Sequence, residues 1–125
     1  MLFRSKKFFE SNIGKRILKS PHPMREFQFT VEIPASLIKG DLPENLSEQK
    51  TVLQGAVDCV FEENDQVVIV DYKTDRSASP EELWERYLPQ LHLYMLAMEQ
   101  VTGKMVKECL LYSFYLNREI KGDFS

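Results

Sequence analysis

The spacing of apolar side chains near the start of the chain predicts a helix over residues 3–19. Phe9, Ile13 and Ile17 recur at intervals of four, and lysine and arginine occupy many of the positions between them. Ser11 followed by Asn12 leaves a second arrangement open, because a short separate helix could begin there. Pro21 and Pro23 then predict an irregular link.

Strict alternation replaces this spacing from residue 26 and predicts a half-buried strand over residues 26–33. One face is apolar and the other polar: Phe27, Phe29, Val31 and Ile33 against Glu26, Gln28, Thr30 and Glu32. Pro34 is expected to end the strand. Residues 34–50 are rich in Pro, Gly, Asp, Asn and Ser, which predicts a long loop.

Two further strands are predicted over residues 51–61 and 66–73. Asn64-Asp65 between them can form a two-residue hairpin turn, because both residue types tolerate positive φ. Residues 67–70 are apolar at every position, which is typical of a strand buried on both faces in the middle of a sheet.

A helix is predicted to begin at Ser79, which can cap it, with Pro80 at the first helical position and Glu82 completing a capping box. Pro89 should kink or divide this helix, and Gly103 should end it. Residues 105–116 alternate again and predict a last strand. Its expected inward face carries Val106, Leu110, Tyr112 and Phe114. The order of elements predicts a small mixed α/β sheet flanked by helices.

Composition favours one globular domain over residues 1–125. The chain is 43% hydrophobic and 28% charged, and no apolar run approaches the roughly 20 residues of a membrane helix. The N-terminus lacks the apolar centre of a signal peptide. Cys59 and Cys109 lie in apolar runs and are expected to be buried free thiols, which suits a reducing compartment such as the cytoplasm. Disulfide scaffolds, haem attachment and secretion are therefore not expected.

Charge is distributed unevenly along the chain. Residues 1–25 carry a net charge of +6 and residues 26–125 carry −9. A basic segment of this kind can contact nucleic acid or an acidic partner, or it can be a solvated helix face. The sequence leaves both interpretations open.

The candidate chemistry lies at Asp58, Asp71 and Lys73. If Asn64 and Asp65 form the turn, facing residues have numbers that sum to 129, so Asp58 faces Asp71 across the hairpin. Lys73 projects from the same face as Asp71. Two facing carboxylates repel unless a cation joins them, and an all-oxygen site favours Mg²⁺ or Mn²⁺. The alternative is an ordinary surface ion pair between Asp71 and Lys73 at the end of a strand.

Three motifs in this order resemble those of RecB-type nucleases of the PD-(D/E)xK superfamily. They are the G-x-x-D of Gln54-Gly55-Ala56-Val57-Asp58, the D-Y-K-T of Asp71-Tyr72-Lys73-Thr74, and the Q-x-x-x-Y of Gln90-Leu91-His92-Leu93-Tyr94. Residues 8–16, 25–27 and 111–114 also resemble the C-terminal nuclease domain of the AddA family of bacterial helicase–nuclease subunits. The resemblance covers about residues 8–118 and implies a restriction-endonuclease-like fold.

The resemblance also implies a role for each matching residue. Asp58, Asp71 and the backbone carbonyl of Tyr72 would hold Mg²⁺, for which Mn²⁺ could substitute, and Lys73 would be the catalytic lysine. The residues that would position the substrate are Gln90, Tyr94, Thr74 and Glu26. For Gln90 and Tyr94, the alternative is a hydrogen-bonding pair at the edge of the core.

The family has an upstream helix that supplies a histidine near the metal, and neither His22 nor His92 fits that position. His22 is expected in an exposed loop and His92 at a surface or partly packed position. We therefore expect a fragment of a larger helicase chain with weak metal binding and weak cleavage. The implied function is hydrolysis of phosphodiester bonds in DNA, most readily single strands, during double-strand break repair by recombination.

The implied partners are DNA, the remainder of the helicase chain and a second nuclease subunit. No membrane partner is expected. The competing hypothesis is a truncated or inactive nuclease fold that only binds DNA or a partner protein.

Overall fold

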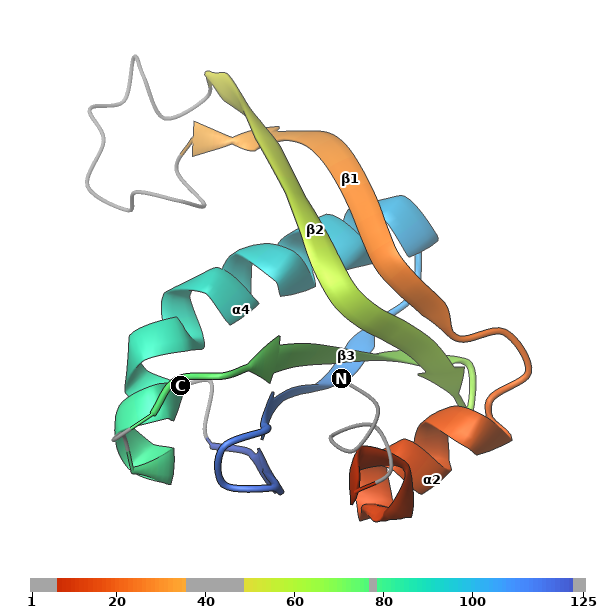
Figure 1. The fold of residues 1–125 in the computed structure, drawn as a ribbon. Helices are drawn as coiled ribbons and strands as arrows, with labels where there is room; N and C mark the ends of the chain where they lie inside the picture. Colours follow the sequence, from red (N-terminus) through yellow and green to blue (C-terminus); the bar gives the residue numbers. More distant parts are fainter. Residues whose placement is uncertain (1–6, 36–48, 77–78, 123–125) are drawn as a thin grey trace.

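The computed structural model describes residues 7–35, 49–76 and 79–122, which form a five-stranded mixed sheet with helices on both faces (Figure 1). The strands follow the order β1-β2-β3-β4-β5 and are β1 (Met24–Pro34), β2 (Lys50–Glu63), β3 (Gln66–Lys73), β4 (Val106–Ser113) and β5 (Arg118–Ile120). The long helices are α2 (Asn12–Lys19) and α4 (Pro80–Thr102). Of the strands that the structure describes, only β3 and β4 pair in parallel, with α4 as their crossover. The predicted α/β class and mixed sheet are confirmed.

The N-terminal helical region is broken at Ser11, as in the second of the two predicted arrangements. Residues 7–10 are helical, and the Ser11 side chain then caps α2 by accepting a hydrogen bond from the Gly14 N–H at 3.1 Å. A β-carbon at Gly14 would lie 2.0 Å from the carbonyl oxygen of Phe8, so only glycine fits this break. Residues 3–6 of the predicted helix lie outside the described residues.

The β2–β3 hairpin forms with the predicted turn and register. Asn64 and Asp65 have φ angles of 52° and 63°, as a tight two-residue turn requires. Glu63 pairs with Gln66 and Cys59 with Val70, so the paired numbers sum to 129 as predicted. β3 is the middle strand of the sheet, and its apolar run is buried on both faces.

α4 begins and ends where the sequence predicts, but Pro89 does not divide it. The Ser79 side chain accepts a hydrogen bond from the Glu82 N–H at 3.2 Å, and Gly103 closes the helix at φ 69°. Pro89 lies on the exposed side of one continuous helix, which bends along its length (Figure 1). A proline removes one backbone hydrogen bond, and on the solvent side water can replace it.

The strand predicted over residues 105–116 is shorter in the structure, and a second strand that was not predicted follows it. β4 ends at Ser113, residues 114–117 form the turn, and β5 returns antiparallel to β4. The prediction that Val106 shares a face with Leu110 and Tyr112 is wrong. The pairing register between β3 and β4 shifts after Val106, and such a bulge reverses the alternation of side chains.

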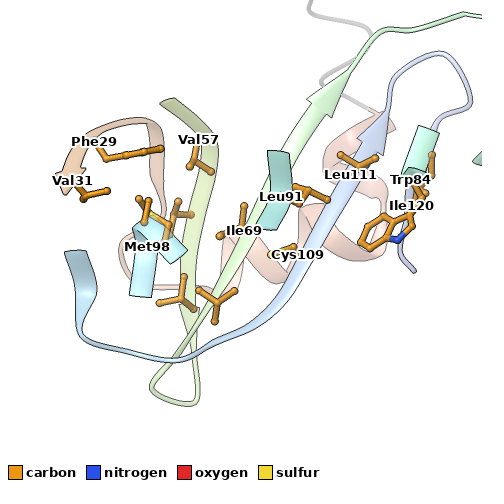
Figure 2. Close-up of a cluster of buried hydrophobic side chains, with 14 of the residues drawn as sticks. Phe29, Val31, Val57, Ile69, Trp84, Leu91, Met98, Cys109, Leu111 and Ile120 are labelled. Carbon is orange, nitrogen blue, oxygen red and sulfur yellow. The ribbon is translucent and has the colours of Figure 1, made fainter. Parts of the chain in front are cut away.

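The sheet separates two groups of buried side chains. The larger group lies against α4 and includes Phe29, Val31, Ile69, Leu91 and Leu111 (Figure 2). The second lies against the N-terminal helices and includes Phe8, Ile13, Ile17, Val70 and Tyr112. Cys59 and Cys109 are buried free thiols, as predicted, and burial raises the pKa of both. Among the described residues, no helix is long and apolar enough to cross a membrane.

Part of the basic N-terminal segment is bound to the body of the domain. The guanidinium of Arg16 forms ion pairs with Glu63, at 2.7 Å, and with Glu108. The hydrogen bond from Arg16 lowers the pKa of Glu63 to about 2. Lys7, Lys15 and Lys19 are exposed and open to contact with DNA, whereas Arg16 is held in ion pairs with the body of the domain.

Candidate active site

The candidate site lies where β2 leaves β3. The ladder between the two strands ends at the pair Cys59 and Val70, one pair short of the predicted pair between Asp58 and Asp71. The Tyr72 N–H, which would continue the ladder, donates instead to Oδ2 of Asp58 at 2.8 Å. The two aspartates therefore meet through their side chains, without the direct backbone pairing that the sequence predicted.

A change of phase in β1 and β2 explains this divergence. Val57 packs in the group of buried residues against α4, whereas Cys59 packs in the group against α2, although alternation would put them on one face. Opposite this point in β1, Glu26 has a φ of 50°, in the left-handed region. We call the Glu26–Asp58 level the crease, and the parts of β1 and β2 beyond it, residues 27–34 and 50–57, the arm.

Asp71 is buried and its carboxyl group has a strongly shifted pKa. Its exposed fraction is 3%, and Nζ of Lys73 lies 2.9 Å from its Oδ2. Burial, followed by the hydrogen bond with Asp58, raises the pKa of Asp71 to about 7, while Lys73 opposes the rise. Oδ2 of Asp71 has no hydrogen bond of good geometry among the described residues, so the ion pair with Lys73 is its polar contact there.

α4 brings two of the predicted substrate-positioning residues to these carboxylates. Nζ of Lys73 donates to Oε1 of Gln90 at 3.2 Å. Burial and the negative charges of Asp71 and Asp58 raise the pKa of Tyr94, so its phenol stays protonated beside them. The Tyr94 ring packs edge-on against Phe29 with centroids 5.9 Å apart.

Gly55, the glycine of the first motif, makes this ring packing possible. A β-carbon at this position would lie 2.8 Å from the ring of Phe29 and 3.5 Å from that of Tyr94. Since the ring of Phe29 is in the way, any side chain here would displace it and, with it, the Tyr94 ring.

Tyr87 and Asp75 belong to the same cluster, and the sequence reasoning missed both. Nζ of Lys73 lies 3.8 Å from the centroid of the Tyr87 ring, and the Tyr87 hydroxyl donates to Oδ2 of Asp75 at 2.7 Å. Two signals could have found them. Tyr87 precedes Gln90 by three residues on one helix face, and Asp75 directly follows the D-Y-K-T motif.

The remaining predicted residues lie at the margin of the cluster. Glu26 is exposed at the crease, and Thr74 is exposed just after β3. His22 is exposed and His92 is half-buried, as predicted. Among the described residues, no group of three or more His, Cys, Asp or Glu side chains converges as a metal site would. The convergent carboxylates are Asp58 and Asp71.

Comparison with known proteins identifies the family to which the chain belongs. A family model described as the PD-(D/E)XK nuclease superfamily matches residues 4–123. The chain belongs to this superfamily. Its mixed sheet with flanking helices is consistent with the restriction-endonuclease-like fold of the PD-(D/E)XK nucleases.

Relatives among curated proteins are named as one component of an ATP-dependent helicase/nuclease. The protein from Clostridium novyi is 41% identical over 117 residues, which cover 91% of this chain and 10% of the relative. That from Thermoanaerobacter pseudethanolicus is 42% identical over 110 residues, which cover 86% of this chain and 9% of the relative. The chain thus spans about a tenth of the length of these relatives.

The oxygen atoms that the candidate site brings together suit a hard divalent cation. Asp58 and Asp71 supply two carboxylates, and burial, followed by the hydrogen bond with Asp58, raises the pKa of Asp71. The N–H and C=O of one residue in an antiparallel strand face the same neighbour, so the Tyr72 carbonyl points to the side from which its N–H reaches Asp58. An all-oxygen donor set of this kind favours hard divalent cations over softer metals.

Replacing Glu26 with glycine is expected to stabilise the domain by about 1 kcal/mol, since glycine adopts positive φ without steric cost. Glu26→Ala serves as the matched control, because it removes the same carboxylate but keeps the strain. The free energy of unfolding, measured by urea denaturation, compares the two variants. Equal stability of both would contradict the strain at the crease.

Proposed function

We propose that this chain is a metal-dependent DNA nuclease domain that hydrolyses phosphodiester bonds. The observation that carries the proposal is the ion pair between the buried Asp71 and the largely buried Lys73, beside which Asp58 lies at the crease. A buried carboxylate needs compensating partners, and Asp71 has one in Lys73. The carboxylate of Asp58 beside it works in the opposite direction, because two negative charges repel. The energetic cost is understandable if the site is built for a cation that binds during function.

Asp58, Asp71 and the Tyr72 carbonyl would hold Mg²⁺, with Mn²⁺ as a substitute. The bound ion would polarise the scissile phosphate and lower the pKa of a water ligand. The Lys73 ammonium lies close enough to Asp71 to orient the attacking water or stabilise charge on a phosphoryl oxygen. Gln90 and Tyr94 would position water or DNA through their amide and hydroxyl groups, with Glu26 and Thr74 at the rim.

The proposed setting of the domain is a larger helicase–nuclease chain. We infer that it acts there, beside a second nuclease subunit, on single strands released during double-strand break repair by recombination. Support comes from the name that the relatives share and from the small fraction of their length that this chain spans.

A DNA- or partner-binding module is the second candidate. The observation that favours it is the small donor set, since the described residues bring two acidic side chains rather than three to the site. Mg²⁺-dependent cutting of a single-stranded oligonucleotide by this chain would decide for the nuclease.

Mn²⁺ affinity provides a direct test. Asp71→Asn is expected to weaken binding by at least roughly 10–100-fold, the loss that removal of even an outer-shell partner causes at many metal sites. Isothermal titration calorimetry measures it, with Asp65→Asn as a control because the Asp65 side chain is 87% exposed in the hairpin turn. If Asp71→Asn binds Mn²⁺ as tightly as the unsubstituted chain, Asp71 is not a ligand.

A further inference from the structure

The ammonium of Lys73 lies among three groups from two elements. Oδ2 of Asp71 is 2.9 Å away, Oε1 of Gln90 is 3.2 Å away, and the centroid of the Tyr87 ring is 3.8 Å away. The Lys73 side chain is 16% exposed. The lysine side chain is a flexible four-carbon stem, so its ammonium takes one defined position only when several neighbouring groups contact it.

The Tyr87 ring is itself fixed by a hydrogen bond at its far end. Its hydroxyl donates to Oδ2 of Asp75 at 2.7 Å, and Nη1 of Arg86 lies 2.8 Å from the same oxygen. The hydrogen bond from Tyr87, with help from Arg86, lowers the pKa of Asp75, so Asp75 is an ionised acceptor. A hydrogen bond to a carboxylate increases the electron density of a phenol ring, which strengthens its attraction for a cation.

Lys73 needs a contact of this kind because its ion-pair partner, Asp71, is also a proposed ligand of the metal. A divalent ion bound by Asp71 would draw on the same carboxylate that pairs with Lys73, and would repel the ammonium. A contact that holds Lys73 without using a carboxylate of the metal site would keep the lysine in place. The face of the Tyr87 ring provides such a contact on the α4 side of the ammonium.

We propose that Tyr87, anchored by Asp75, is a positioning residue that holds the Lys73 ammonium in place for the reaction. The proposal rests on the proposed nuclease function and adds two residues to it. Tyr87 acts through Lys73 and Asp75 acts through Tyr87. Neither needs to touch DNA.

Cleavage kinetics give the first test, with Mg²⁺ and a single-stranded oligonucleotide. Tyr87→Leu is expected to lower kcat roughly tenfold with little change in KM, because the cation–π contact is lost. Tyr87→Phe keeps the ring but loses the anchor, and should lower kcat about threefold. Asp75→Ala should match Tyr87→Phe, and the double variant should show no further loss, because both changes remove one hydrogen bond.

The exposed Tyr115 in the turn after β4 offers matched controls. Tyr115→Leu and Tyr115→Phe make the same chemical changes away from the cluster and should cut at the unsubstituted rate. A wild-type kcat for Tyr87→Leu would overturn the proposal.

NMR tests the position of Lys73 without any cleavage. With ¹³C-labelled lysine, the ε-methylene protons of Lys73 should be shifted upfield by the Tyr87 ring, and Lys73→Met identifies their signal. Tyr87→Phe should keep this shift and Tyr87→Leu should lose it, whereas Tyr115→Leu should leave it unchanged. If the shift persists in Tyr87→Leu, the ring does not hold the ammonium. If the chain fails to cut DNA but shows this pattern, the nuclease function fails while the contact stands.

Discussion

Replacing Lys73 with alanine is expected to lower the single-turnover rate of DNA cleavage by about 10²–10³-fold, a loss typical of removing one charge-stabilising donor. The affinity for single-stranded DNA should stay nearly unchanged. The Lys73 side chain is only 16% exposed and pairs with Asp71, so in the proposed nuclease its ammonium would act on the reacting phosphate more than on the DNA backbone at large. An interaction made mainly in the transition state lowers the rate without lowering affinity when it is removed.

The measurement pairs quenched-flow cleavage with fluorescence anisotropy of a labelled oligonucleotide. Lys50→Ala is the matched control, because Lys50 is an exposed lysine at the start of β2. Cleavage by Lys73→Ala at the unsubstituted rate would show that Lys73 is not the catalytic lysine. Absence of metal-dependent cleavage in the unsubstituted chain would favour the binding module.

Replacing Asp71 with asparagine is expected to stabilise the metal-free domain by about 2 kcal/mol at pH 8. The folded-state pKa of Asp71 is about 7, above its ordinary value of 3.8, so the folded protein binds the proton more tightly than the unfolded chain does. Stability from this group is therefore lost as pH rises from about 4 to about 7. One pKa unit corresponds to about 1.4 kcal/mol, and loss of the ion pair with Lys73 offsets part of the gain.

Urea denaturation in EDTA at pH 5 and pH 8 checks this expectation. The advantage of Asp71→Asn over the unsubstituted chain should be larger at pH 8, and Asp65→Asn should show no such trend. If Asp71→Asn is less stable at both pH values, Asp71 has a structural salt-bridge role instead. Saturating Mn²⁺ should reverse the order of stability, because it binds only the folded, unsubstituted site tightly.

Short-range rules predicted the elements that depend on neighbouring residues. Asn64-Asp65 determined the turn and the register of the hairpin, and Ser79 and Gly103 determined the bounds of α4. Once that register was known, Asp58 and Asp71 could be placed close together from the sequence alone.

Features that depend on distant partners were not predicted. The crease requires β1 and β2 to change phase at the same level, and nothing local in Asp58 or Glu26 indicates it. The bulge after Val106 depends on pairing with β3, and β5 is too short for alternation to reveal it. The contact between Lys73 and Tyr87 arises only when α4 packs across the sheet.

We expect the arm to open at the crease separately from the rest of the domain. Beyond the crease, β1 and β2 pair only with each other among the described residues (Figure 1). Apolar side chains of the arm, among them Phe29 and Val31, pack in the group of buried residues against α4 (Figure 2). Such a unit can undergo local unfolding at lower free energy than the whole domain, and amide hydrogen exchange would report it. Because Asp58 lies at the crease, each opening of the arm would separate the carboxylates of Asp58 and Asp71. If Asp58 and Asp71 bind a cation as proposed, its apparent affinity would depend on the fraction of molecules whose arm is closed, and partner contacts that hold the arm closed would tighten metal binding from a distance.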